Sequence, residues 1–228
     1  MAARKSIRQK RAERRQRERR QRRIQMAVVT LLVVSIIGYF AFQRFNRPQA
    51  APVSPERLVD DPSQGPADAP VVVTEYGDFG CEACQSWHQA GVLDQILDDF
   101  PDQVKLVWKD FPIIFPPFSE RAALAGQCAH DQGLFWEYQD EVYWRTSYTA
   151  LRDDDLLDYA QRAGLDQDAF ATCFESQQHL QTVQLDFDEA RALGLRVTPA
   201  FLVNGRYFLG ANPQLLINAI LAELSWPI

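Results

Sequence analysis

Two cysteines that lie two residues apart carry the most chemical information in this sequence of 228 residues. Cys81 and Cys84 follow a β-rich run and open a segment with a helical apolar pattern. Cys81 is therefore expected at an exposed helix N-terminus, where the helix dipole and free backbone N–H groups stabilise a thiolate. Cys81 is the candidate nucleophile of a redox dithiol, and Cys84, one turn further in, is the candidate resolving thiol.

A CxxC pair is also half of many zinc sites, so the rest of the sequence must decide between metal binding and redox chemistry. Zinc needs two further ligands. The other two cysteines stand alone, and the three histidines are scattered at positions 88, 130 and 179. Because no second CxxC and no HxxxH pair completes a tetrahedral set, we expect no metal and favour thiol–disulfide exchange.

The segments around the dithiol predict a β-α-β unit. Residues 71–76 form a short, β-rich apolar run that suits a buried central strand. Residues 84–100 follow with a helical apolar face, and residues 103–111 alternate well enough for a second strand. The two sulfurs therefore lie where a strand gives way to a helix.

The rest of the chain predicts a helical insertion and a second β unit. Residues 119–193 carry almost no strand signal, and five stretches within them are amphipathic: 120–130, 134–145, 154–163, 166–175 and 178–193. Two short β runs then flank Asn204-Gly205, a strong hairpin signal, and residues 213–224 predict a last helix. This order predicts an α/β fold, with helices on both faces of a mixed sheet and an inserted helical subdomain.

The charges divide unevenly along the chain. Residues 1–47 hold 14 of the 24 lysines and arginines, and an uncharged stretch of seventeen residues at 26–42 is just long enough to span a bilayer. The basic block then matches the cytoplasmic flank under the positive-inside rule. A cleaved signal peptide and an RNA-binding arginine block are the alternatives. We expect an uncleaved anchor in the lipid bilayer and no nucleic-acid partner.

These features divide the chain into four parts. Residues 1–23 are predicted as a basic cytoplasmic tail and 24–43 as one transmembrane helix. Residues 44–69 contain five prolines, which favours an extended linker. Residues 70–228 are predicted as the folded domain, placed outside the cytoplasm.

Several motifs of the folded part resemble one known family. EYGDFGCEACQSWH, QGLFWEYQDEVY and VTPAFLVNG, in this order and spacing, resemble the DsbA-type thiol:disulfide oxidoreductases, over about residues 65–226. The resemblance implies a thioredoxin-like fold interrupted by helices between its two halves, which agrees with the order of elements predicted above.

The resemblance also implies roles for three residues away from the dithiol. Thr198 and Pro199 would form the loop beside the sulfurs, with Pro199 in the cis form and the Thr198 backbone offered to an extended client. Glu75 matches a buried acidic position that relays a proton to or from Cys84, and burial would raise its pKa. The alternatives are that Pro199 merely begins a strand and that Glu75 is exposed at a sheet edge.

Two neighbours of the dithiol bear on its redox poise. Glu82 departs from the family's commonest pattern, and its negative charge should raise the pKa of Cys81 and make the disulfide a weaker oxidant. His88 lies four residues after Cys84, on the same helical face, where a protonated imidazole can favour a thiolate. A packed or solvated histidine without such a role is the simpler interpretation.

Cys128 and Cys173 both fall in the helical insertion. Outside the cytoplasm they can form a structural disulfide. Such a bridge would contribute about 4 kcal/mol on the chain-entropy model. The alternative is two buried thiols that act as small apolar residues.

The sequence therefore predicts a single-pass protein of the cell membrane that transfers its Cys81–Cys84 disulfide to reduced, unfolded client proteins. The exchange needs no cofactor. The resemblance implies a membrane-bound partner of the quinone-linked DsbB or VKOR-like kind that reoxidises the dithiol. The alternatives are a disulfide reductase or isomerase with the same fold, and a non-catalytic module that binds clients.

Overall fold

The computed structural model describes residues 26, 35, 61–145, 151–208 and 212–225 of the chain. The chain divides into two units, Met1–Gln49 and Ala50–Ile228. Apart from Met26 and Ser35, the predicted tail, anchor and most of the linker lie outside the described residues. Among the residues that the structure describes, no helix is both long enough and apolar enough to cross a bilayer.

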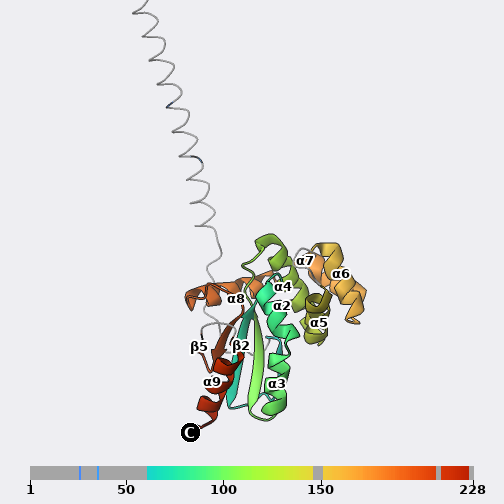
Figure 1. The fold of residues 1–228 in the computed structure, drawn as a ribbon. Coiled ribbons are helices and arrows are strands. Elements are labelled where there is room, and N and C mark those ends of the chain that lie inside the picture. The colour runs from blue at the N-terminus through green and yellow to red at the C-terminus, as the bar shows by residue number, and fades with distance from the viewer. Residues whose placement is uncertain (1–25, 27–34, 36–60, 146–150, 209–211, 226–228) are drawn as a thin grey trace, which may run out of the picture. The chain divides into compact units, whose positions relative to one another are not determined.

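A mixed sheet of five strands forms the centre of the second unit (Figure 1). The strands are β1 (Ser63–Gln64), β2 (Val71–Gly77), β3 (Val104–Asp110), β4 (Ala200–Val203) and β5 (Arg206–Phe208), in the spatial order β1-β3-β2-β4-β5. β2 and β3 run parallel, and the other neighbours pair antiparallel. The predicted mixed sheet is therefore present, with β2 at its centre.

The crossover between the parallel strands consists of two helices, α2 (Glu82–Gln89) and α3 (Val92–Asp99). The prediction of one continuous helix over residues 84–100 was wrong. Gly91 caps α3 with a φ of 64°, in the left-handed region that glycine adopts at little cost, and the chain breaks there. Both helices have an apolar side. The hydrophobic pattern of residues 84–100 therefore looks the same for two helices as for one.

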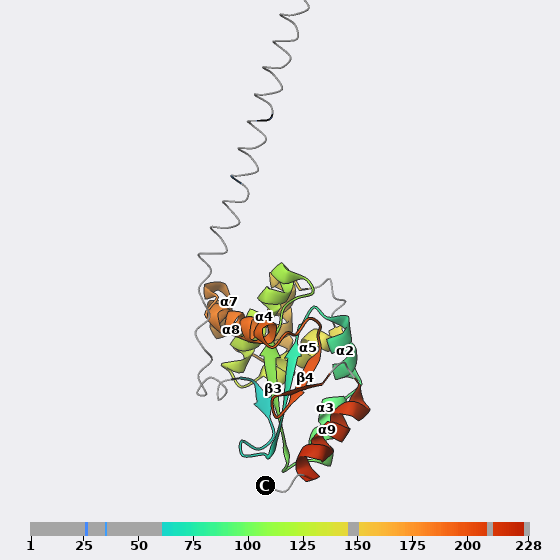
Figure 2. The same cartoon turned by 90° about the vertical axis from the view of Figure 1, so that its left-hand side faces the viewer.

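Alternating residues of the strands face two different cores. Val71, Val73 and Phe201 belong to a core covered by α3 and α9 (Pro213–Ser225), which lie on the same side of the sheet in Figure 2. Tyr76 and Leu202 point to the opposite side, where residues of α8 pack against them. This period of two is what burial on both faces of a sheet requires.

The helical insertion consists of α4 (Pro116–His130), α5 (Phe135–Arg145), α6 (Asp153–Arg162), α7 (Gln167–Ser176) and α8 (Leu180–Ala192). Each of the five predicted helices is present, with ends within a few residues of those expected. Small residues of α4 are buried, and the ring of Phe79 lies 6.2 Å from that of Phe135 and 5.6 Å from that of Tyr143. The insertion thus packs directly on the loop that precedes Cys81.

The folded domain begins earlier than the composition predicted. Residues 61–69 were assigned to the linker, but β1 pairs with β3, and the Trp108 N–H donates to the Pro62 carbonyl at 2.9 Å. Prolines are tolerated at a sheet edge because an edge strand leaves part of its backbone unpaired. A proline-rich composition therefore cannot separate a spacer from a short edge strand.

Candidate active site

The end of β2 and the start of α2 position the two cysteines. Cys81 is the N-cap residue of α2, with extended backbone angles, and its Sγ accepts from the Cys84 N–H at 3.4 Å. Both thiols are free, Cys81 is 5% exposed, and Cys84 is fully buried. A sulfur at a helix N-cap faces unpaired N–H groups, as the CxxC spacing predicted, but the expectation that this helix end is exposed was wrong, because Cys81 is buried beside the Thr198 carbonyl.

Asp78 holds the loop that carries Cys81. Its carboxylate accepts from the Gly80 N–H at 2.7 Å and from the Ile113 and Ile114 N–H groups at 2.8 Å. Its carbonyl accepts from the Cys81 N–H at 3.0 Å. Asp78 was not among the residues predicted to form the site. Its place in a short loop could have indicated this role, because aspartate side chains there often accept hydrogen bonds from nearby backbone N–H groups.

The two thiols differ strongly in acidity. A hydrogen bond from the Cys84 thiol lowers the pKa of Cys81 to about 6 against the opposing effect of burial, and the Thr198 side chain and backbone N–H groups also lower it. Burial, together with the hydrogen bond to Cys81, raises the pKa of Cys84 well above the usual range. At neutral pH the pair therefore holds one reactive thiolate and one protonated, buried thiol.

Thr198 lies against the dithiol. The Cys81 thiol donates to the Thr198 carbonyl at 3.3 Å, and the peptide bond between Thr198 and Pro199 is cis. The sheet accounts for this proximity, because Ala200, the next residue, pairs with Tyr76 on β2. Among the described residues the buried Thr198 hydroxyl makes no hydrogen bond, and it can donate to the Cys81 thiolate and so lower the pKa of that thiol.

Glu75 is buried at the centre of the sheet rather than exposed at an edge. It pairs in register with Trp108 on β3 and Phe201 on β4. Burial, followed by the charge of Cys81, raises the pKa of Glu75 to about 8. Glu75 also contributes to the raised pKa of Cys84, so the carboxyl group lies within electrostatic reach of both sulfurs.

The other two candidate residues lie differently from these. His88 turns toward α5, where its Nε2 lies 2.7 Å from Asp140 Oδ1 and its ring lies 5.1 Å from that of Tyr143. Glu82 is exposed in the first turn of α2. The pKa of Cys81 is lowered in spite of the Glu82 charge, so this neighbour does not decide the direction of the shift.

Two glutamines that were not predicted as site residues join α2 to α5. The Gln85 and Gln89 amides both donate to the Tyr143 carbonyl, at 2.6 Å and 2.8 Å. The Tyr143 hydroxyl donates to the Asp78 carbonyl at 3.3 Å. Tyr143 thus contacts both the helix and the loop that carry the dithiol, and the helical insertion supports the site.

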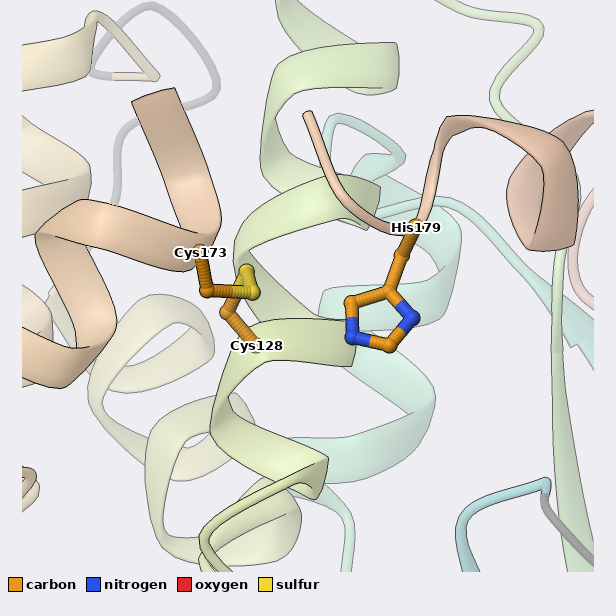
Figure 3. A group of neighbouring side chains, drawn as sticks. All are labelled: Cys128, Cys173 and His179. Atoms are coloured by element: carbon orange, nitrogen blue, oxygen red, sulfur yellow. A yellow bond between two sulfur atoms is a disulfide. The ribbon is translucent and has the colours of Figure 1, made fainter. Parts of the chain in front are cut away.

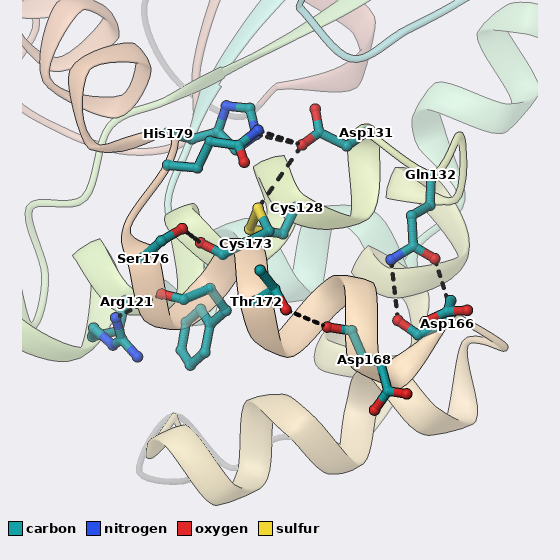
Figure 4. Close-up of a disulfide and its surroundings, with 12 residues drawn as sticks. Arg121, Cys128, Asp131, Gln132, Asp166, Asp168, Thr172, Cys173, Ser176 and His179 are labelled. Atoms are coloured by element: carbon teal, nitrogen blue, oxygen red, sulfur yellow. Dashed lines mark hydrogen bonds and ion pairs between the residues drawn. A yellow bond between two sulfur atoms is a disulfide. The ribbon is translucent and has the colours of Figure 1, made fainter.

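Cys128 and Cys173 are joined by a disulfide between α4 and α7, with an S–S distance of 1.99 Å (Figure 4). Of the two alternatives that the sequence left open, the structure has the bridge. The bridge closes the helical subdomain on itself, away from the Cys81–Cys84 pair in sequence.

Comparisons with known proteins agree with this geometry. A family model described as thioredoxin matches residues 57–221, and the chain belongs to that family. Among solved structures, the chain resembles oxidised BdbD from Bacillus subtilis, with 22% identity and a TM-score of 0.67 over 74% of this chain and 95% of that one. It also resembles reduced DsbA from Mycobacterium tuberculosis, with 19% identity and a TM-score of 0.58 over 73% and 93%. The chain therefore has the fold of DsbA-type thiol:disulfide oxidoreductases.

Curated relatives are more similar in sequence but much longer. The Na(+)/H(+) antiporter NhaA 1 of Salinispora arenicola is 37% identical over 171 residues, which cover 74% of this chain and 25% of that protein. The antiporter NhaA of Herminiimonas arsenicoxydans is 34% identical over 170 residues, which cover 75% and 26%. The chain thus spans about a quarter of the length of these relatives.

Proposed function

We propose that this protein is a membrane-anchored, extracytoplasmic thiol:disulfide oxidoreductase that transfers its Cys81–Cys84 disulfide to folding client proteins. The observation that carries the proposal is the contrast between the two thiols. Cys81 has a pKa of about 6, whereas the buried Cys84 has a raised pKa. A dithiol with one stabilised thiolate beside one protonated partner suits disulfide exchange.

The exchange proceeds in two displacements. A client thiolate attacks Sγ of Cys81, which forms a mixed disulfide and releases Cys84 as a thiolate. A second client thiolate then attacks the client sulfur of the mixed disulfide and releases Cys81. The client loses two electrons and two protons, and the Cys81–Cys84 pair gains the two electrons.

Glu75 can supply the proton that the released Cys84 thiolate takes up. With a pKa of about 8 the carboxyl group is mostly protonated at neutral pH, and it interacts electrostatically with the Cys84 sulfur, whose pKa is raised chiefly by burial. In the reverse step, when Cys84 attacks a mixed disulfide, the same carboxylate can accept the proton. We assign Glu75 as a proton relay on these grounds.

The oxidising direction is favoured by the acidity of Cys81. A stabilised thiolate stabilises the reduced form, and so makes the disulfide the stronger oxidant. The exposed Glu82 charge favours the opposite direction and makes a reductase or isomerase the second candidate. Because about 30 mV corresponds to 1.4 kcal/mol for two electrons, modest electrostatic effects matter here.

The membrane location rests on the uncharged stretch at residues 26–42 and the basic block before it. Relatives named as Na(+)/H(+) antiporters carry a similar segment in about a quarter of their length, which fits a domain that works beside a membrane. We further propose reduced, unfolded proteins as clients and a quinone-linked membrane protein of the DsbB or VKOR-like kind as the oxidant that restores the disulfide.

The deciding measurement is the reduction potential of the Cys81–Cys84 pair in the full chain, equilibrated against glutathione buffers. A potential near or above about −180 mV supports disulfide donation, whereas a value near about −270 mV would contradict it and favour a reductase. A client-binding module is tested separately with Cys81→Ala. If client folding is unchanged in this variant, the dithiol has no part in the function.

A further inference from the structure

A second group of reactive side chains lies in the helical insertion. The ligand-type atoms of Cys128, Cys173 and His179 all lie within 4.8 Å of one another (Figure 3). Asp131 joins them, because its Oδ2 lies 2.7 Å from His179 Nε2 and 3.8 Å from Cys173 Sγ (Figure 4). Two sulfurs, one imidazole and one carboxylate therefore meet in one place.

The helix ends bring these four side chains together. Cys128 and Asp131 lie three residues apart at the end of α4, and so share one face of the helix. Cys173 lies in the last turn of α7, whose C-cap residue, Gln177, has a φ of 53°. This left-handed residue reverses the chain and places His179, the N-cap residue of α8, beside the disulfide (Figure 3).

The disulfide accounts for the two sulfurs, and the imidazole and the carboxylate beside them pair with each other. A bonded sulfur carries no proton, so the contact of 3.8 Å between Cys173 and Asp131 is not a hydrogen bond while the bridge is intact. Two thiolates, an imidazole and a carboxylate are the ligands that zinc prefers, and four such ligands complete a tetrahedral site. Their spacing, two close ligands from α4 and two from the α7–α8 turn, also resembles that of zinc sites.

We propose that reduction of the Cys128–Cys173 disulfide creates a zinc site formed by Cys128, Cys173, His179 and Asp131. A dithiol donates two electrons and two protons to the bridge and is itself oxidised to a disulfide. Zinc then replaces the protons of the two thiols, which are released to solvent. The sulfurs must move from 1.99 Å apart to about 3.8 Å, which follows from tetrahedral angles and Zn–S bonds of about 2.3 Å.

The surroundings allow a metal ion to enter. The two cysteines are buried, but the side chains of His179 and Asp131 are 18% and 40% exposed and form the outer side of the cluster. Gln178 holds the carboxylate in place, since its amide donates to Asp131 Oδ2 at 3.1 Å. The metal would link α4, α7 and the start of α8, so the helices that the disulfide joins would stay connected in the reduced protein.

The test measures zinc binding by the full chain in both redox states. Cys81→Ser/Cys84→Ser serves as the parent because it removes the other dithiol. The parent is reduced with dithiothreitol, separated from the reductant without oxygen, and titrated with zinc against a chromogenic chelator. We expect one zinc ion per reduced chain and none per oxidised chain. Cobalt(II) should give the absorption bands of a tetrahedral site with thiolate ligands.

His179→Ala identifies the site, and His130→Ala, which changes the histidine two residues after Cys128, is the matched control. We expect His179→Ala to weaken zinc binding by more than about tenfold and His130→Ala to leave it unchanged. Failure of the reduced parent to bind zinc, or equal binding by His179→Ala, would overturn the proposal. If the parent does not fold, the same comparison is made between the reduced wild-type chain and its His179→Ala variant, which should bind one zinc ion fewer.

Discussion

The thiol of Cys81 donates to the carbonyl oxygen of Thr198 across 3.3 Å, although 117 residues separate them in the sequence. The contact joins the two halves of the thioredoxin-like fold, which the helical insertion divides. In the proposed function, a client that pairs with the Thr198 backbone has its own sulfur beside Cys81.

The two cysteines should behave differently when replaced. Cys84→Ser should accumulate mixed disulfides with clients, because the attacking thiolate remains and the thiol that resolves the complex is lost. Cys81→Ser should form none, and its exchange activity should fall to background. Non-reducing electrophoresis of the two matched variants measures this. Equal amounts of complex with both variants would contradict the assignment of Cys81 as the nucleophile.

The reduced protein should show a thiolate that titrates near pH 6. The lowered pKa means that the folded state binds this proton less tightly than the unfolded state, whose thiol titrates at about 8.5. The stabilisation is therefore fully present above about pH 8.5 and is lost as the pH falls through about 6. Ultraviolet absorbance of the thiolate and melting temperatures measured against pH test this. Cys81→Ser should lack both effects, and a thiolate that appears only above pH 8 would contradict the prediction.

Glu75→Gln should slow exchange without unfolding the protein. A buried carboxyl group with a pKa of about 8 is mostly neutral at pH 7, so the neutral amide replaces it closely. We expect the rate to fall about 10²-fold, the lower end of the range for general acid–base groups. The control is Glu82→Gln, which removes an exposed carboxylate. This control should not slow exchange. An unchanged rate in Glu75→Gln would contradict the assignment of Glu75 as a proton relay.

Lys109 should be essential for stability. It is 1% exposed, and its Nζ lies 2.7 Å from Asp61, 3.2 Å from Asp186 and 3.3 Å from Glu189. Lys109→Met leaves these carboxylates without their cation, so we expect a loss of about 3–5 kcal/mol in the free energy of unfolding by urea. Lys105→Met, on the same strand but partly exposed, should lose much less. Similar losses in both variants would show that the buried charges are not the cause.

Removal of the Cys128–Cys173 bridge should also destabilise the folded domain. The bridged residues are 45 positions apart, and the chain-entropy model assigns a loop of that length about 4 kcal/mol. Unfolding of Cys128→Ser/Cys173→Ser is measured in urea with a chelator present, so that no metal contributes. Cys81→Ser/Cys84→Ser, kept oxidised, retains the bridge and is the control. Equal midpoints would mean that the bridge does not stabilise the fold.

Local patterns predicted most of the secondary structure, and the exceptions share a cause. The break at Gly91 and the strand at Ser63–Gln64 are both short features within longer stretches of consistent composition. A window wide enough to detect periodicity averages over them. For this reason residues 61–69 were assigned to the linker and not to the folded domain. The five helices of the insertion were each predicted.

The sequence by itself determined the CxxC pair, the order of the elements and the place of Cys81 at a helix N-terminus, because these depend on spacing along the chain. The tertiary structure alone decided the environment of each group: the burial of Glu75, the contact between His88 and Asp140, the ion pairs of Lys109 and the disulfide beside His179. Burial and charge act through distance in space and not through position in the chain, so the acidity of a side chain is set only when the fold has brought its neighbours together.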